Sequence, residues 1–236
     1  MKTKGFSLIE LMVAMVVGLF VAGIVATMYV SIIRANSTTV QLSRLNQDLQ
    51  STMDIIARDI QRSGYDADSA QNLARNTSGA HITSAGVATT SDTEAVFYAF
   101  QIVSGAMTTT PQDYNSVANC ILLRYDANDD GVVGGATSQP EIMAYRYAAA
   151  SSAVEYQSWT SVASQSCTGT GWQTLAGGDG HLNVNNLTFT LKPASGASPS
   201  FGQRSIVVAI SGSSATDPAL SVTLSREVRL RNDQFQ

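Results

Sequence analysis

One acidic side chain, Glu10, lies in an apolar run that carries no other charge from Phe6 to Ile33. A carboxylate inside a membrane-spanning or tightly packed helix is costly unless a positive group neutralises it. Cleavage of the chain after Gly5 would create such a group, because a new α-amine on Phe6 has an ordinary pKa of about 8. Phe6 and Glu10 are four residues apart and therefore share a helix face. The spacing predicts that amine and carboxylate neutralise each other, within one subunit or between two, so that Glu10 sets the register of an added subunit.

The residues before the apolar run fit processing at a membrane. Lys2 and Lys4 hold the first residues on the cytoplasmic side, and the glycine after them gives a peptidase an unhindered backbone. As a helix, residues 6–33 span about 42 Å, which exceeds the ~30 Å hydrocarbon core of a bilayer. A secretory signal peptide has a shorter apolar segment, and an ordinary single-pass anchor leaves Glu10 unexplained. We expect residues 1–5 to be a leader and residues 6–33 a transmembrane or filament-core helix.

Small residues recur every four positions in this segment, at Ala14, Gly18, Ala22 and Ala26. Such a strip lets helices approach closely in lipid or in a filament core. Membrane helices are also rich in small residues in general, so both interpretations stay open.

The helical pattern continues past the membrane-length segment. Apolar residues recur at steps of three and four, as on one face of a helix, at Leu42, Leu45, Leu49, Met53, Ile56 and Ile60. The opposite face is polar, with Gln41, Arg44, Gln47, Asp48, Asp54, Arg58 and Gln61. Asp54 and Arg58 have the acid-before-base spacing that stabilises a helix.

The end of this helix is marked by Arg62, a cation suited to the last turn, and by Gly64, a plausible stop. We expect one helix from Phe6 to about Ser63, in which residues 34–64 are an amphipathic continuation that packs on a sheet.

The remainder, residues 65–236, predicts a β-rich globular domain, because short apolar runs alternate with clusters of Gly, Ser, Asn and Asp. The expected strands are Ala95–Val103, Cys120–Tyr125, Ile142–Ala148, Leu187–Lys192, Ser205–Ser211 and Leu220–Leu230. The fourth and sixth alternate apolar and polar residues, which indicates one buried and one wet face. Loops are expected at 104–111 and 193–200. The expected fold is α+β, a long protruding N-terminal helix packed on a C-terminal antiparallel β-sheet domain.

Two cysteines, Cys120 and Cys167, lie in the β-rich region. In an oxidising compartment they are expected to pair, which contributes about 4 kcal/mol in the chain-entropy model. Two free thiols are the alternative.

A calcium loop places oxygen donors at positions one, three and five, a glycine at six and a backbone carbonyl at seven. These positions are matched by Asp126, Asn128, Asp130, Gly131 and Val132. Position twelve is Thr137 rather than Glu, and the flanks look like strands, so the segment is no EF-hand and Glu141 would have to supply a bidentate carboxylate. A polar hairpin loop is the alternative, because Asp, Asn and Gly favour turns for backbone reasons.

Charge and motif content exclude other classes of protein. The formal net charge of -4 argues against direct binding of nucleic acid, which needs a basic face. The sequence contains no nucleophile elbow and no combined nucleophile, base and stabiliser, so we expect no enzymatic activity and no required cofactor beyond the candidate Ca²⁺.

Three segments carry a resemblance to a known family: Gly5–Leu11 (GFSLIEL), Ala57–Tyr65 (ARDIQRSGY) and Arg226–Asn232 (REVRLRN). With them the sequence resembles the type IV prepilins and, more narrowly, the PilW family of minor pilins. The resemblance implies a type IV pilin-like fold, cleavage after Gly5 and methylation of Phe6 by a prepilin peptidase, and a role in assembly for Glu10.

The resemblance also implies a function and a location. The expected function is a minor pilin that primes or caps a type IV pilus (fimbrium), so that twitching motility, adhesion or DNA uptake depend on it indirectly. Its partners would be the peptidase, other major and minor pilins through the helix, and the inner-membrane assembly platform. It would span the inner membrane once, with a periplasmic globular domain, before joining a surface pilus. A pseudopilin of type II secretion and a tip adhesin or ligand-binding module are the alternatives.

Overall fold

The computed structural model describes residues 5, 7–65, 81–82, 88–89, 100–103, 117–129, 139–160, 165–192 and 205–231. The chain divides into two compact units, Met1–Arg44 and Leu45–Gln236. The boundary falls inside the segment 34–64 that the sequence marks as amphipathic. The predicted boundaries at residues 5 and 33 stay predictions.

Helix α1 covers Leu8–Arg62 and confirms the predicted helix, although Phe6 lies outside the described residues. At its start the Ser7 N–H donates to Glu10 Oε2 at 3.0 Å, a Ser-x-x-Glu arrangement that satisfies a free donor of the first turn. At its end Gly64 has a φ of 77°, the left-handed conformation that stops helices. The predicted stop is thus confirmed.

The first unit contains the apolar part of α1. Every apolar side chain from Leu8 to Ile33 is exposed, and the helix is long and apolar enough to cross a membrane by length and composition. Such a surface is stable only in lipid or against other helices.

The second unit contains two main antiparallel sheets. The four-stranded sheet has the order β11-β10-β9-β4, with β4 at Val117–Ala118, β9 at Leu182–Lys192, β10 at Ser205–Ser214 and β11 at Ser221–Arg229. The five-stranded sheet has the order β3-β5-β6-β7-β8, with β3 at Phe100–Val103, β5 at Cys120–Arg124, β6 at Ile142–Ala148, β7 at Ala153–Trp159 and β8 at Gln173–Gly177. A separate pair joins β1 (His81–Ile82) to β2 (Ala88–Thr89).

The six predicted strands are found, with β6 at the predicted bounds and β9 and β10 longer than predicted. Strand β3 begins at Phe100, while residues 95–99 and both predicted loops lie outside the described residues. Strands β1, β2, β4, β7 and β8 were not predicted. The α+β class with antiparallel sheets is confirmed.

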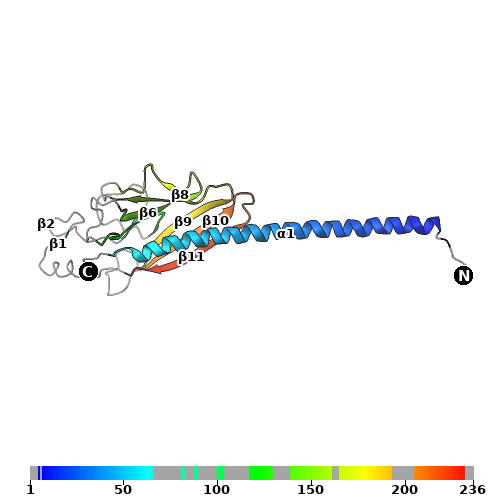
Figure 1. Ribbon diagram of the computed structural model, residues 1–236, viewed down its shortest axis with the longest axis horizontal. Helices are drawn as coiled ribbons and strands as arrows, with labels where there is room; N and C mark the ends of the chain where they lie inside the picture. Colours follow the sequence, from blue (N-terminus) through cyan, green and yellow to red (C-terminus); the bar gives the residue numbers. More distant parts are fainter. Residues whose placement is uncertain are drawn as a thin grey trace. The chain divides into compact units, whose positions relative to one another are not determined.

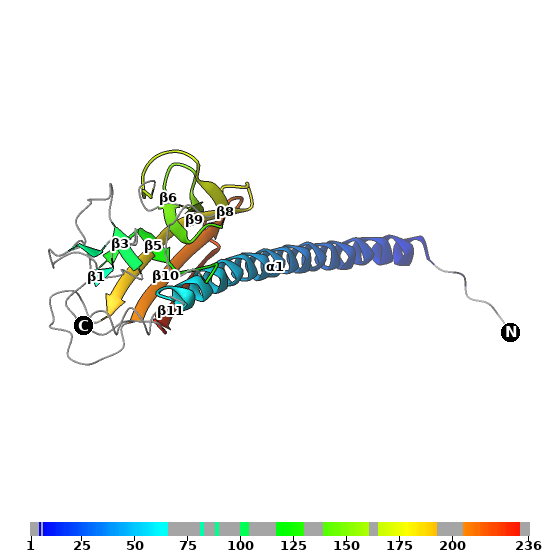
Figure 2. The same cartoon turned by 60° about the vertical axis from the view of Figure 1, so that its left-hand side comes forward.

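The main core joins the second half of α1 to both sheets. The predicted stripe is buried, since each of its residues from Leu45 to Ile60 is at most 4% exposed, and Leu42 is half-buried. These side chains share one cluster with residues of β5, β6, β9 and β10, namely Ile121, Leu123, Tyr145, Leu187, Phe189, Leu191, Ile206, Val208 and Ile210. Figures 1 and 2 show the cyan end of α1 beside β10 and β11.

Candidate assembly site and helix docking surface

The start of α1 carries the residue that the sequence singles out. Glu10 is exposed, and one of its oxygens accepts the Ser7 N–H. A carboxylate has about four acceptor positions, so this bond leaves capacity for an α-amine one turn away. The negative charge also suits the positive end of the helix dipole. Cleavage after Gly5, which is exposed, and the pairing with the Phe6 amine stay predictions.

The small-residue strip of Ala14, Gly18, Ala22 and Ala26 lies on the exposed helix of the first unit. A Cβ built on Gly18 has no heavy atom within 4 Å. None of the described residues of this unit, 5 and 7–44, therefore covers the strip, and its role in close helix approach stays a prediction.

The surface that docks α1 onto the sheets contains a buried acid that the sequence reasoning missed. Asp59 is 7% exposed, and its carboxylate accepts a hydrogen bond from the hydroxyl of Tyr145 in β6. Arg62 Nη1 lies 3.8 Å from the other oxygen of Asp59. Its guanidinium also lies 4.4 Å from the centre of the Tyr125 ring, a favourable cation–π geometry.

Burial and the neighbouring Asp59 carboxylate raise the pKa of Tyr145 well above its ordinary value. The hydroxyl therefore keeps its proton and acts as the donor. Thr52 and Asp59 are seven residues apart and adjoin the apolar stripe, and both are buried. The same spacing also fits the edge of the polar face, so the sequence alone does not reveal that Asp59 is buried.

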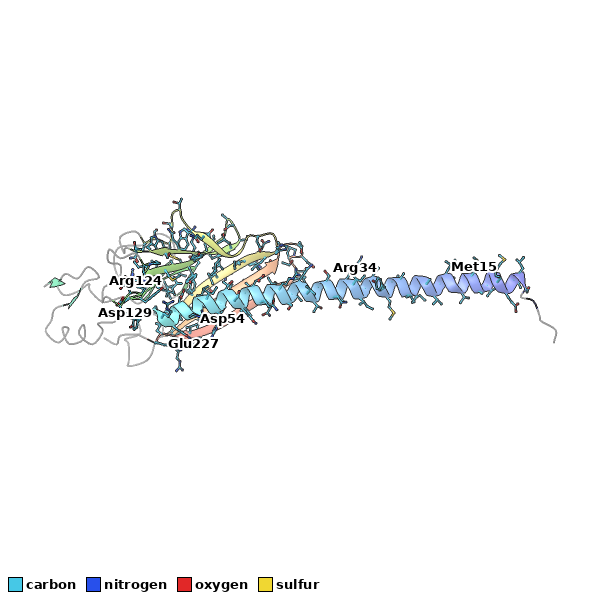
Figure 3. All side chains as sticks on the ribbon, in the orientation of Figure 1. Met15, Arg34, Asp54, Arg124, Asp129 and Glu227 are labelled. Atoms are coloured by element: carbon cyan, nitrogen blue, oxygen red, sulfur yellow. A yellow bond between two sulfur atoms is a disulfide. The ribbon has the colours of Figure 1, made fainter. Side chains whose placement is uncertain are left out.

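The chain that leaves α1 is bound to the end of β5. The Gly64 N–H donates to the Arg124 carbonyl at 2.8 Å, and the Asp126 N–H donates to the Tyr65 carbonyl at 2.8 Å. The Tyr65 hydroxyl reaches Asp129 Oδ1 at 3.1 Å. Arg124 and Asp129 lie close to the end of α1 (Figure 3). Part of the segment Ala57–Tyr65 thus forms the junction between helix and sheet.

The calcium prediction falls partly outside the described residues, since Asp130 and Val132 are not among them. Asp126 and Glu141 are buried, and Asn128 is half-buried. Among the described residues, no three His, Cys, Asp or Glu side chains gather as metal ligands. The calcium site stays a prediction, which calorimetric titration of the full chain tests.

The segment Arg226–Asn232, here called the closing segment, connects β11 to α1 and to β9 through its side chains. Asp54, which lies in the last turns of α1 (Figure 3), pairs with Arg226 of β11. The described residues show no ion pair between Asp54 and Arg58. Glu227 accepts the Ser205 hydroxyl at 2.6 Å and lies 3.5 Å from Lys192 Nζ. The Ser205 hydrogen bond, then the lysine charge, lower the pKa of Glu227.

The outer face of the five-stranded sheet is covered by residues 165–172, here called the strap. Cys120 of β5 and Cys167 of the strap form the predicted disulfide, above a second core that includes Leu122, Ile142 and Ala144.

Two arginines hold the strap as well. Arg146 Nη1 donates to the Cys167 carbonyl at 3.0 Å, and its guanidinium stacks 4.2 Å from the Trp172 ring centre. Arg124 Nη2 donates to Gln165 Oε1 at 2.8 Å. The disulfide is therefore one of several bonds between the strap and the sheet.

Two family models match the sequence. The model described as prepilin peptidase-dependent protein B covers residues 38–230, which is most of the chain. The model of the prokaryotic N-terminal methylation motif covers residues 1–26. No curated protein and no solved structure matches the chain.

The second model contains the glycine, phenylalanine and glutamate of the predicted processing site, and the first contains the docking surface, the strap and most of the closing segment. The narrower resemblance to the PilW family stays a prediction. The two matches together cover all three segments on which the resemblance rests, apart from the last two residues of the closing one, and the chain therefore belongs to the prepilin peptidase-dependent protein B family, as a type IV prepilin-like minor pilin.

Proposed function

We propose that the chain primes or caps the assembly of a type IV pilus. The observation that carries the proposal is Glu10, a lone carboxylate in the exposed apolar helix of the first unit, inside the methylation motif. An exposed apolar helix needs lipid or other helices around it. A carboxylate on it needs a positive partner, and the amine of a processed subunit supplies one.

The proposal has a location and a set of partners. Before assembly the apolar helix spans the inner membrane once and the second unit lies in the periplasm. A prepilin peptidase removes residues 1–5 and methylates the new N-terminus. Other pilins then bind through the helix at the inner-membrane assembly platform, and the subunit becomes part of a surface pilus.

Deletion of the gene tests this role against the alternatives. Loss of surface pili with normal secretion of exoproteins is the expected result. Normal piliation with lost secretion would instead assign the chain to a type II secretion system as a pseudopilin. A truncation that removes the region after Tyr65 tests the third alternative, because pili that persist in that strain but no longer attach would identify a tip adhesin.

A substitution in the same strain tests the part played by the carboxylate. Glu10→Gln keeps size and hydrogen-bonding capacity but removes the charge, so the amine of a neighbouring subunit loses its partner. Because an unpaired buried charge typically costs about 3 to 5 kcal/mol, we expect the variant to be inserted and processed yet absent from sheared filaments. Asp48→Asn, on the exposed face of α1, is the matched control and should assemble normally.

A further inference from the structure

The apolar stripe of α1 in the second unit repeats along the helix, so hydrophobic burial alone favours more than one alignment. The buried stripe repeats at every turn, from Leu45 through Leu49 and Met53 to Ile56 and Ile60. A slip of one turn, about 5.4 Å, places each of these side chains near the site of the next. Because hydrophobic contact is not directional, the stripe alone leaves neighbouring alignments close in free energy.

Asp59 breaks this repeat. It is a carboxylate on the buried face, bonded to the hydroxyl of Tyr145, which is itself 1% exposed. A slip of one turn separates the two groups and leaves an acceptor and a donor in the core without each other. A buried polar group that loses its partner bears its full desolvation penalty.

The contacts next to Asp59 also favour the observed alignment of α1. Arg62 lies next to Asp59 and over the Tyr125 ring, and the Gly64 N–H donates to the Arg124 carbonyl. The Asp54–Arg226 pair is about half exposed on both sides, and exposed pairs contribute little because water screens them. The buried contacts at the end of the helix therefore contribute most to fixing the alignment of α1 on the sheets.

We propose that Asp59, through Tyr145, is a positioning residue that selects one register of α1 on the two sheets. Buried polar groups are best attested in this role, since a polar residue in an apolar contact specifies the register at a cost in stability. The inference concerns the fold of the second unit and holds whether or not the chain acts in a pilus.

Cross-linking of the full chain in detergent tests the register directly. The probe is a short bifunctional thiol reagent applied to three double variants, in which Arg226→Cys is combined with Asp54→Cys, Arg58→Cys or Gln50→Cys. The three helix positions are exposed and one turn apart, and the native cysteines are held in the disulfide. With Asp59 present, position 54 should react fastest with position 226.

Asp59→Leu is expected to raise the cross-linking rate of position 50 or 58, relative to position 54, by about tenfold, the effect of losing one hydrogen bond to a charged group. Its thermal midpoint should fall, because the Tyr145 hydroxyl is left in the core without its acceptor. Tyr145→Phe, which removes only the hydroxyl, should shift the ratio in the same direction. Asp59→Asn keeps an oxygen that accepts a hydrogen bond from Tyr145, so its ratio of cross-linking rates should equal that of the parent. Asp48→Asn should not change this ratio either.

An unchanged ratio in both Asp59→Leu and Tyr145→Phe overturns the proposal, and a lowered midpoint with an unchanged ratio assigns Asp59 a role in stability alone. If Asp59→Leu does not fold, the ratio in Tyr145→Phe decides the question by itself.

Discussion

Gly64 ends α1 in a backbone conformation that side chains with a Cβ disfavour, since its φ is 77°. We expect Gly64→Ala to lower the free energy of unfolding of the second unit by about 1 to 2 kcal/mol. Chemical denaturation of the purified full chain, followed by tryptophan fluorescence, measures it. Gly23→Ala is the control, because its added Cβ has no heavy atom within 4 Å. Equal midpoints for the two variants would contradict this explanation of the helix stop.

The contribution of Asp179, in the turn before β9, to folding stability depends on pH. Its Oδ1 accepts the N–H groups of Leu182 and His181, and these bonds lower the pKa of the carboxyl group. A lowered pKa in the folded state contributes stability above the unfolded value of about 3.9 and loses it as the pH falls through the folded value. Asp179→Asn should therefore reduce the thermal midpoint at pH 6 and narrow the difference from the parent as the pH falls below about 4. A difference between the two thermal midpoints that grows as the pH falls would contradict this explanation.

Single residues also show that local spacing can be predicted from the sequence and that long-range partners cannot. The spacing of Glu10, Gly5 and Phe6 is local, so the sequence contains it entirely. Asp59 has its partner Tyr145 86 positions away, and no local pattern distinguishes a buried acid from one on the wet face. Asp54 likewise has a local partner by spacing, Arg58, while the structure brings it to Arg226.

Among the elements, α1 was the most predictable, because its apolar stripe repeats over many turns. One fully buried residue of its apolar stripe is Leu49, which is 0% exposed. Leu49→Ala should cost about 2 to 5 kcal/mol, since it loses transfer free energy and leaves a cavity. Ile55→Ala on the same helix, where the side chain is 40% exposed, should cost much less. Urea midpoints of the two variants provide the measurement, and similar losses would mean that α1 does not pack as described.

The strap is an element held by a covalent bond and by polar contacts at once. The disulfide spans 47 residues, so a Cys120→Ser/Cys167→Ser variant should lose about 4 kcal/mol of unfolding free energy. Because Arg146 and Arg124 still hold the strap, the folded variant should keep the near-ultraviolet signal of Trp159 and Trp172, whose rings pack edge to face. Loss of that signal under native conditions would show that the disulfide alone docks the strap.

Strands were less predictable where long-range contacts define them. Strand β9 begins at Leu182, five residues before the predicted start, and it includes three asparagines. A register shift against Ser211 and Gly212 places one of them, Asn185, as an extra residue in the strand. Strand β7 mixes polar and apolar residues, and its Glu155 is paired with Arg146 of β6. Both features depend on a neighbouring strand, so periodicity in one segment does not reveal them.

At the scale of the molecule, the two units follow different physical rules. The first unit exposes its apolar side chains from Leu8 to Ile33, and the second buries the stripe from Leu45 to Ile60 against its sheets. A single helix thus combines a surface for other helices or lipid with a surface for its own sheets. Family membership follows from both units together, since one family model matches each part of the chain.

The measurement that tests the central claim most directly is the N-terminal sequence and intact mass of the mature protein, isolated from membranes and from sheared filaments. The account predicts a chain that begins at Phe6, with one added methyl group on its α-amine, in both fractions. A chain that retains Met1 in filaments, or a mature chain that never enters them, would contradict it.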